Sequence, residues 1–109
     1  MKLKSAIKIG RDTAYMHRLG GGWAVVTYHN WDFRLGHASE PMPYGRACQM
    51  VREHRIQWAL IACGDKPVRA GEAPYGELAH IWAQVSGTWE DNVRVLADRL
   101  GFEPIDRIN

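Results

Sequence analysis

Residues 14–28, AYMHRLGGGWAVVTY, decide the fold that we expect for this chain. Two runs of strand-forming residues flank three consecutive glycines, and glycine adopts positive φ angles at little cost. The pattern predicts a β-hairpin in which strands at 14–18 and 23–28 are joined through Leu19-Gly20-Gly21-Gly22. Strands connected this closely pair in the antiparallel direction, so the first half of the chain is expected to form an antiparallel sheet.

Three further segments extend this sheet in the prediction. Residues 2–9 alternate lysines with apolar side chains and predict a strand before the hairpin, whereas residues 33–37 predict a short strand after it. Residues 56–63 are apolar apart from Gln57, which is typical of a strand that is covered on both faces or central in a sheet. We therefore expect three or four early strands and one later strand.

Apolar residues recur at helical spacing in three other segments. They predict helices at about 44–55, 74–85 and 88–100, with Thr88 as the cap of the last one. The expected fold is α+β, with an antiparallel sheet of three to four strands plus one later strand. About three helices pack mainly on one face of that sheet, and residues 1–109 form a single domain.

The composition is that of an ordinary folded domain, with 46% hydrophobic and 24% charged residues. We see neither a signal peptide nor an apolar run of the roughly 20 residues that cross a bilayer, and so expect a cytoplasmic protein without membrane contact. The two cysteines, Cys48 and Cys63, lack the spacing of a redox or metal motif and are expected to be reduced and buried.

No residue pattern indicates catalysis or a cofactor. His29, Asp32 and His37 lie close in sequence but have none of the helical or paired spacings of metal ligands. Cys63 ends an expected strand, where many enzymes present reactive groups, yet no neighbouring base would activate its thiol. We therefore expect a protein with no enzymatic activity, no metal and no cofactor.

Charge is distributed unevenly along the chain, although the net charge is only +2. Residues 1–55 carry nine Lys or Arg against four Asp or Glu, whereas residues 56–109 carry five against eight. This asymmetry indicates an acidic partner for the first half of the chain. It is equally typical of a solvated surface that binds nothing.

A basic and aromatic face is expected on the N-terminal part of the sheet. Lys2, Lys4 and Lys8 alternate along the first expected strand and would point the same way. Arg18 and Tyr28 lie on the neighbouring strands. Proteins that bind single-stranded nucleic acids hold phosphates with such cations and stack bases on such rings, so a nucleic acid is one candidate ligand.

A second candidate surface surrounds Trp31, which lies between Asn30 and Asp32 in an expected polar turn. No apolar stripe accounts for this tryptophan, and Arg34 follows three residues later. Tryptophan and arginine are enriched at the centres of protein interfaces, so the pair predicts a surface that binds another protein. The competing interpretation is that Trp31 folds over the end of the sheet.

Two segments resemble small accessory proteins of phages and prophages. They are Gly21-Gly22-Trp23-Ala24-Val25-Val26 and Met42-Pro43-Tyr44-Gly45-Arg46-Ala47, and the similarity covers about residues 20–55. The resemblance implies a phage genomic context. Small phage proteins without catalytic motifs often act by occupying a host protein surface, and anti-CRISPR and other anti-defence proteins are the best-known group.

Two hypotheses for the function follow. The first is a small non-enzymatic module that binds a protein, including the case of a phage-encoded inhibitor of a host defence or regulatory complex. The alternative is a nucleic-acid-binding protein that uses the basic, aromatic face of the N-terminal sheet. The oligomeric state stays open.

Overall fold

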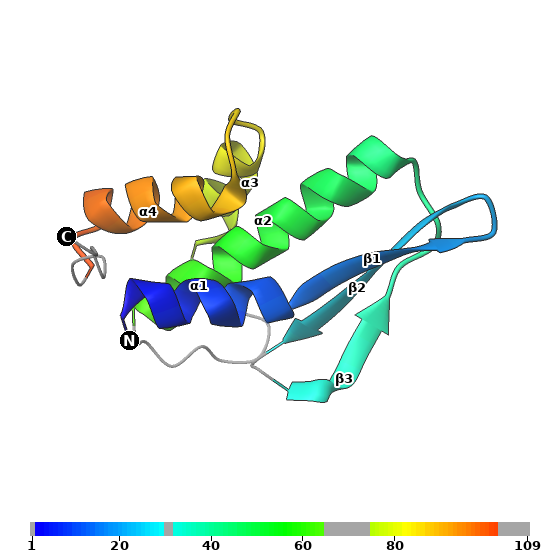
Figure 1. The fold of residues 1–109 in the computed structure, drawn as a ribbon, viewed down its shortest axis with the longest axis horizontal. Helices are drawn as coiled ribbons and strands as arrows, with labels where there is room; N and C mark the ends of the chain where they lie inside the picture. The colour runs from blue at the N-terminus through cyan, green and yellow to red at the C-terminus, as the bar shows by residue number, and fades with distance from the viewer. Residues whose placement is uncertain (1, 30–31, 65–74, 103–109) are drawn as a thin grey trace.

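The computed structural model describes residues 2–29, 32–64 and 75–102, with the side chains of residues 29 and 32–35 excepted. Its elements are, in chain order, α1 (Leu3–Asp12), β1 (Ala14–Leu19), β2 (Gly22–His29), β3 (Asp32–Ala38), α2 (Tyr44–Cys63), α3 (Gly76–Ala83) and α4 (Trp89–Arg99) (Figure 1). The strands form an antiparallel sheet in the order β1-β2-β3. The predicted α+β class is confirmed, with three strands and four helices in the described part of the chain.

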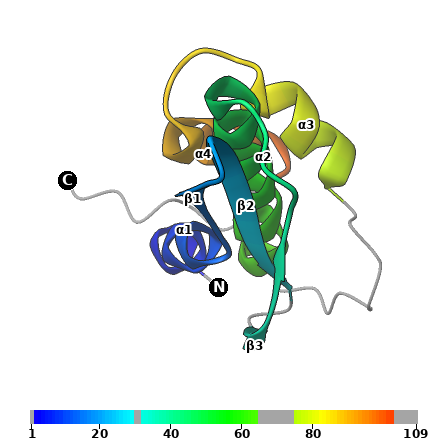
Figure 2. The same cartoon turned by 90° about the vertical axis from the view of Figure 1, so that its right-hand side faces the viewer.

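Helix α2 runs through the middle of the molecule and contacts α1, α3, α4, β1 and β2. Its N-terminal half lies against the sheet, and its C-terminal half lies among the other three helices (Figures 1 and 2). A small hydrophobic cluster of Ala14, Val25, Ala47 and Val51 joins the sheet to α2. A larger cluster joins α1, α3 and α4 to the other half of α2. Both clusters therefore depend on this one helix.

The predicted hairpin is present as β1 and β2, but its loop is shorter than expected, because Leu19 and Gly22 belong to the strands. Leu19 pairs with Gly22, and between them Gly20 and Gly21 have φ angles of 56° and 84°. Two consecutive positive φ angles are those of a type I′ turn, whose twist matches that of the flanking strands. The short strand predicted at 33–37 is also present, as β3 beside β2.

The strand predicted at 2–9 is wrong, because this segment belongs to α1. Leu3, Ala6, Ile7 and Gly10 are its buried residues, and their spacing is that of one helix face. Ala6 is the residue that separates the two structures. A strand would place it on the same face as the lysines, whereas in the helix it is fully buried.

Gly10 allows α1 to cross α2 at close range. A Cβ atom at this position would lie 2.6 Å from the carbonyl oxygen of Arg55 and 2.8 Å from the Cβ atom of Ala59. Real Cβ atoms do not approach other atoms so closely, so a larger residue would separate the two helices. The glycine therefore sets the position of α1, and with it that of the N-terminal lysines.

The later strand predicted at 56–63 is also wrong, because these residues form the C-terminal half of α2. Ile56 and all residues from 58 to 63 are buried. An apolar run of this length suits a buried strand and a buried helix equally, and periodicity does not separate them. Here the neighbouring helices cover the segment from several sides, so it has no polar face. Among the described helices, α2 included, none has the length and apolar character of a membrane span.

Helices α3 and α4 lie near their predicted positions, but part of their expected apolar stripes is exposed. Thr88 caps α4 as predicted, by accepting a hydrogen bond of 3.2 Å from the backbone N–H of Asp91. Among the apolar residues at helical spacing in segments 74–85 and 88–100, Ile81, Val85 and Leu100 are exposed. Ala79 and Ala83 are buried in the larger cluster instead, because α3 meets its neighbours through small side chains.

The connection between α3 and α4 is held by Arg52 of α2. Its guanidinium donates hydrogen bonds to the carbonyl oxygens of Ala83 (3.1 Å), Val85 (3.0 Å) and Gly87 (2.7 Å). Ala83 is the last residue of α3, where backbone acceptors have no partner within the helix, and Val85 and Gly87 follow it. One side chain thus caps α3 and fixes the entry to α4.

Candidate functional site

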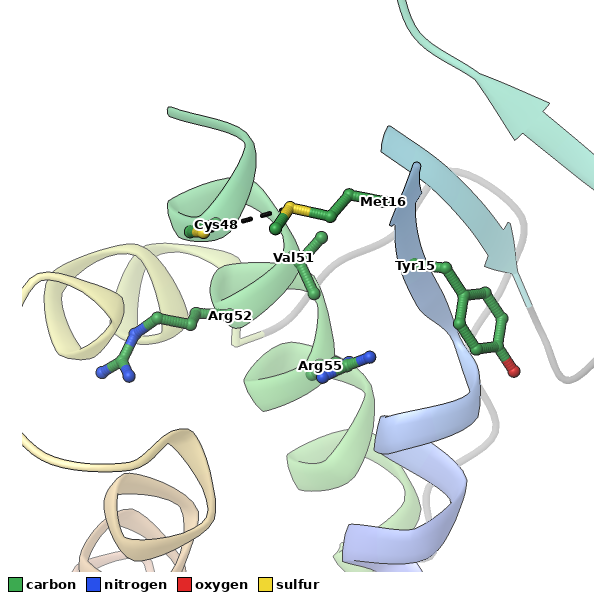
Figure 3. A pocket seen from close by; sticks show the side chains of 6 residues that line it. All are labelled: Tyr15, Met16, Cys48, Val51, Arg52 and Arg55. Atoms are coloured by element: carbon green, nitrogen blue, oxygen red, sulfur yellow. Dashed lines mark hydrogen bonds between the residues drawn. The ribbon is translucent and has the colours of Figure 1, made fainter. Parts of the chain in front are cut away.

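An open cavity of about 410 Å³ lies between strand β1 and helix α2. We call it the β1 groove, and its lining consists of Tyr15, Met16, Cys48, Val51, Arg52 and Arg55 (Figure 3). The surface that it presents is mainly apolar. Its volume falls in the range of cavities that bind ligands, roughly 300–1,000 Å³.

The apolar wall of the groove comes from side chains that meet between the strand and the helix. Met16 of β1 points toward Cys48 and Val51 of α2 (Figure 3). The Cys48 thiol donates to the thioether of Met16, with 3.9 Å between the two sulfur atoms. Methionine is flexible and polarisable, so a wall that contains it adapts to different apolar ligands.

The two arginines at the groove are already engaged with the protein's own backbone. Arg52 holds the α3–α4 connection, and Arg55 donates from Nε (3.1 Å) and Nη2 (2.8 Å) to the carbonyl oxygen of Ala14. Burial lowers the pKa of Arg55, since removal from water disfavours its charged form. Both guanidiniums therefore shape the groove more than they offer free charge to a ligand.

The hydrogen bonds between β1 and β2 show which backbone groups of β1 point away from the sheet. The backbone N–H of Tyr28 donates to the carbonyl oxygen of Thr13 (2.8 Å). In an antiparallel pair, every second residue bonds to the neighbouring strand. The backbone N–H and C=O groups of Tyr15 therefore point toward β2, whereas those of Met16 and Arg18 point away from it. No other strand covers this edge in the part of the chain that the structure describes.

The hydrogen bonds of Arg55 agree with this alternation, and they cover only the beginning of the outer edge of β1. The carbonyl oxygen of Ala14 accepts its two hydrogen bonds from Arg55, so it points away from β2 as the alternation requires. The outward backbone groups of Met16 and Arg18 come next along the strand. They lie directly beside the groove, whose lining includes the Met16 side chain.

The sheet also has a face that α2 does not cover. Helix α2 packs on the face that carries Ala14, Met16 and Val25. Alternation places Tyr15 and Leu19 on the opposite face, where they are 44% and 50% exposed. Large apolar side chains are thus exposed along the same strand whose edge is open.

The predicted site residues of the sheet do not form one surface. Tyr28 lies on the same face as Tyr15, opposite to α2, with its ring 6.2 Å from that of Tyr15 in an edge-to-face arrangement. Arg18 pairs across the strands with Trp23 and lies on the other face. Trp31 and the side chain of Arg34 lie outside the described residues, so the predicted surface around them stays a prediction.

The predicted lysine face of the sheet is wrong, because the lysines belong to helix α1 and its entry. Lys2 precedes the first turn, and Lys4 and Lys8 lie one turn apart on the exposed side of the helix. They are therefore separated from Arg18 and Tyr28. Among the described residues, no three His, Cys, Asp or Glu side chains gather as metal ligands do; the side chains of His29 and Asp32 lie outside the described residues.

Sequence reasoning missed the β1 groove itself. Met16 and Cys48 are 32 residues apart. Considered alone, each has the pattern of a core residue, Met16 in its strand and Cys48 in its helix. The exposed tyrosine at position 15 is the only local signal, since alternation places it opposite to the buried Ala14. Comparison with known proteins adds no further information: no protein-family model, curated protein or solved structure matches the chain.

Proposed function

We propose that this chain is a protein-binding module that receives an extended segment of its partner along the open edge of β1. The observation that carries the proposal is the position of that edge, directly beside an apolar groove. A segment that adds to a sheet gains affinity from main-chain hydrogen bonds and specificity from pockets for alternate side chains. Both components are available here, from Met16 and Arg18 and from the groove.

The side chains of the groove favour binding over catalysis. The strongest nucleophile among them is the thiol of Cys48, and this thiol donates its hydrogen bond to the thioether of Met16. A thioether cannot act as the general base that a catalytic thiol requires.

The groove favours an apolar side chain in the partner segment. Its two charged groups are occupied by backbone carbonyls, which leaves Met16, Cys48 and Val51 as the contact surface. We expect a segment with an apolar residue at every second position, because alternate side chains of an added strand would point into the groove. The intervening residues would pass Tyr15 on the uncovered face.

The resemblance to phage accessory proteins supports a host complex as the partner. We propose that the chain is an inhibitor that occupies the surface of a host defence or regulatory complex in the cytoplasm. An added strand suits this role because it needs only an extended segment or an exposed sheet edge on the target. No enzymatic activity or cofactor is required for such inhibition.

A peptide selection tests the binding mode. Random 12-residue peptides displayed on phage would be selected on the protein, and the enriched sequences would then be synthesised with N-methyl groups on alternate backbone amides. Added strands bond through every second amide, so N-methylation in one phase should abolish binding while the other phase is tolerated. Peptides that tolerate both phases, or no enrichment at all, would contradict the proposal.

A proline variant provides the matched test on the protein side. Arg18→Pro removes an outward N–H of β1 without removing a bond to β2, and proline is tolerated at such edge positions. We expect this variant to lose the selected peptides, whereas Arg18→Ala keeps them. Equal binding by the two variants would show that the edge is not used. Melting temperatures of both proteins establish that they remain folded.

A further inference from the structure

A second groove, of about 430 Å³, lies between helices α1 and α4. We call it the α1–α4 groove, and its lining consists of Lys4, Ile7, Lys8, Arg11, Thr88, Glu90 and Arg94. The two helices contact each other, and Figure 2 shows both of them on the opposite side of α2 from α3. Four of the seven lining side chains are cations and one is an acid.

Helical geometry brings three of these cations into one row. Lys4, Lys8 and Arg11 follow each other at intervals of four and three residues, so they share a face of α1. With a rise of 1.5 Å per residue, the row extends over about 10 Å along the helix axis. Arg94 of α4 adds a fourth cation from the other wall.

The carboxylate of Glu90 neutralises only one of the four cations in the groove. Glu90 accepts a hydrogen bond from Nη2 of Arg11 at 3.2 Å. In the described part of the chain, no ion pair involves the ammonium groups of Lys4 and Lys8, and Arg94 makes only a long contact of 3.5 Å with the backbone carbonyl of Glu90. Three positive charges therefore face one cavity without a counter-charge, which raises its affinity for anions.

Arg11 and Thr88 are held in place around this cavity. The guanidinium of Arg11 lies 5.9 Å from the centre of the buried Trp89 ring, so its orientation is supported by a cation–π contact as well as by Glu90. The Thr88 hydroxyl oxygen accepts the bond from the Asp91 N–H, and its own proton stays available to an anion. The groove thus contains a supported guanidinium, a hydroxyl donor and the ammonium groups of Lys4 and Lys8.

We propose that the α1–α4 groove binds the phosphodiester backbone of a nucleic acid. A nucleic acid carries one charge at every residue, so a row of cations over about 10 Å meets consecutive phosphates. Carboxylates in a protein partner have no such regular spacing. None of the described side chains that line the groove is aromatic, so they offer bases no surface for stacking, and we expect binding there to be independent of sequence.

The proposal gives a quantitative salt dependence. Three neutralised phosphates predict a slope of about −2.7 for log K against log [salt] with duplex DNA and about −2.1 with a single strand. Raising the salt concentration from about 50 to 200 mM should therefore weaken duplex binding about 40-fold. Fluorescence anisotropy with labelled 20-nucleotide single strands and 20-base-pair duplexes of two unrelated sequences measures both values.

Two single-charge variants show whether the groove is the site. Lys8→Gln removes one contact and should reduce the slope on duplex DNA to about −1.8, so that the same change in salt weakens binding only about 12-fold. Arg46→Gln removes the same charge from an exposed position on the first turn of α2, outside the lining of both grooves. It should leave the slope unchanged.

Three outcomes would overturn this inference. They are the absence of binding at 50 mM salt, equal effects of Lys8→Gln and Arg46→Gln, and displacement of the oligonucleotide by inorganic tripolyphosphate or polyglutamate at the same concentration of charge. The last outcome would assign the groove to small phosphates or to acidic peptides. Arg18→Pro should bind oligonucleotides as the unmodified protein does, so failure of this inference is distinguishable from failure of the β1 proposal.

Discussion

The guanidinium of Arg55 lies 5.8 Å from the centre of the Trp89 ring. From this position it also donates both of its hydrogen bonds to the carbonyl oxygen of Ala14. A residue of α2 thereby joins the first residue of α4 to the first residue of β1. Trp89 is contacted by Arg11 as well, so one indole ring contacts an arginine of each groove.

This relationship makes Arg55 a residue on which stability should depend strongly. Arg55→Ala removes two charge-assisted hydrogen bonds and one cation–π contact, and we expect a loss of about 2–4 kcal/mol in the free energy of unfolding. Arg55→Lys should restore only part of this loss, because an ammonium group cannot reproduce the planar two-bond geometry. Urea unfolding measures both, and Arg46→Ala, which changes an exposed arginine, should cost less than about 0.5 kcal/mol.

Gly10 should tolerate no side chain. Gly10→Ala places a Cβ atom against the backbone of α2, and we expect overpacking to cost about 1–3 kcal/mol. A methyl group added at Gly45, in the first turn of α2, would meet no atom within 4 Å. Gly45→Ala should therefore be neutral or stabilise the protein by up to about 1 kcal/mol. Similar effects of the two substitutions on urea unfolding would contradict the close approach of α1 and α2.

Tyr15 should matter for binding and not for folding. Its side chain is 44% exposed and lines the β1 groove. Tyr15→Ala should weaken the binding of the selected peptides by at least about 10-fold, the effect of truncating an interface anchor. The melting temperature should change little. Leu19→Ala, on the same face but outside the groove lining, is the matched control, and an equal loss in both variants would place the contact on the sheet face instead.

Inhibition of a host defence system has a direct measurement. The protein would be expressed in bacteria whose CRISPR–Cas system targets a phage, and the efficiency of plaque formation would be counted. We expect it to rise by at least 10-fold with the unmodified protein and with Arg18→Ala, and to return to its original value with Arg18→Pro. Unchanged plaque formation with the unmodified protein across the major CRISPR–Cas types would exclude this class of target.

The parts of the fold that the sequence predicts correctly are those determined locally. The reversal of the hairpin needs only the positive φ angles of Gly20 and Gly21, and the cap of α4 needs only Thr88. The strand predicted at 56–63 is wrong because the burial of this segment depends on residues far away in the chain. The strand predicted at 2–9 is wrong because Leu3 and Ile7 fit both a strand and a helix face, and only the burial of Ala6 separates the two. Hydrophobic periodicity identifies a helix only when one side of it is exposed. The neighbouring helices cover α2 from several sides, so residues 56–63 have no polar face.

The same distinction applies to the binding surfaces. The row of Lys4, Lys8 and Arg11 is visible in the sequence once the segment is treated as a helix, because the spacing is local. The contribution of Arg94 and Glu90 to the groove cannot be predicted from this local spacing, since both residues belong to a helix about 80 residues later in the chain. The open edge of β1 is a property of strand order, which no local pattern contains.

The position of α2 has a consequence for how the protein unfolds. The two hydrophobic clusters share no residue, yet each is built on one half of this helix, so neither survives its melting. Unfolding is therefore expected to be a single cooperative event, although the core is divided. Amides near the middle of α2 then exchange with solvent only when the whole molecule opens. Because both parts of the core depend on one helix, we expect this small chain to unfold as one cooperative unit.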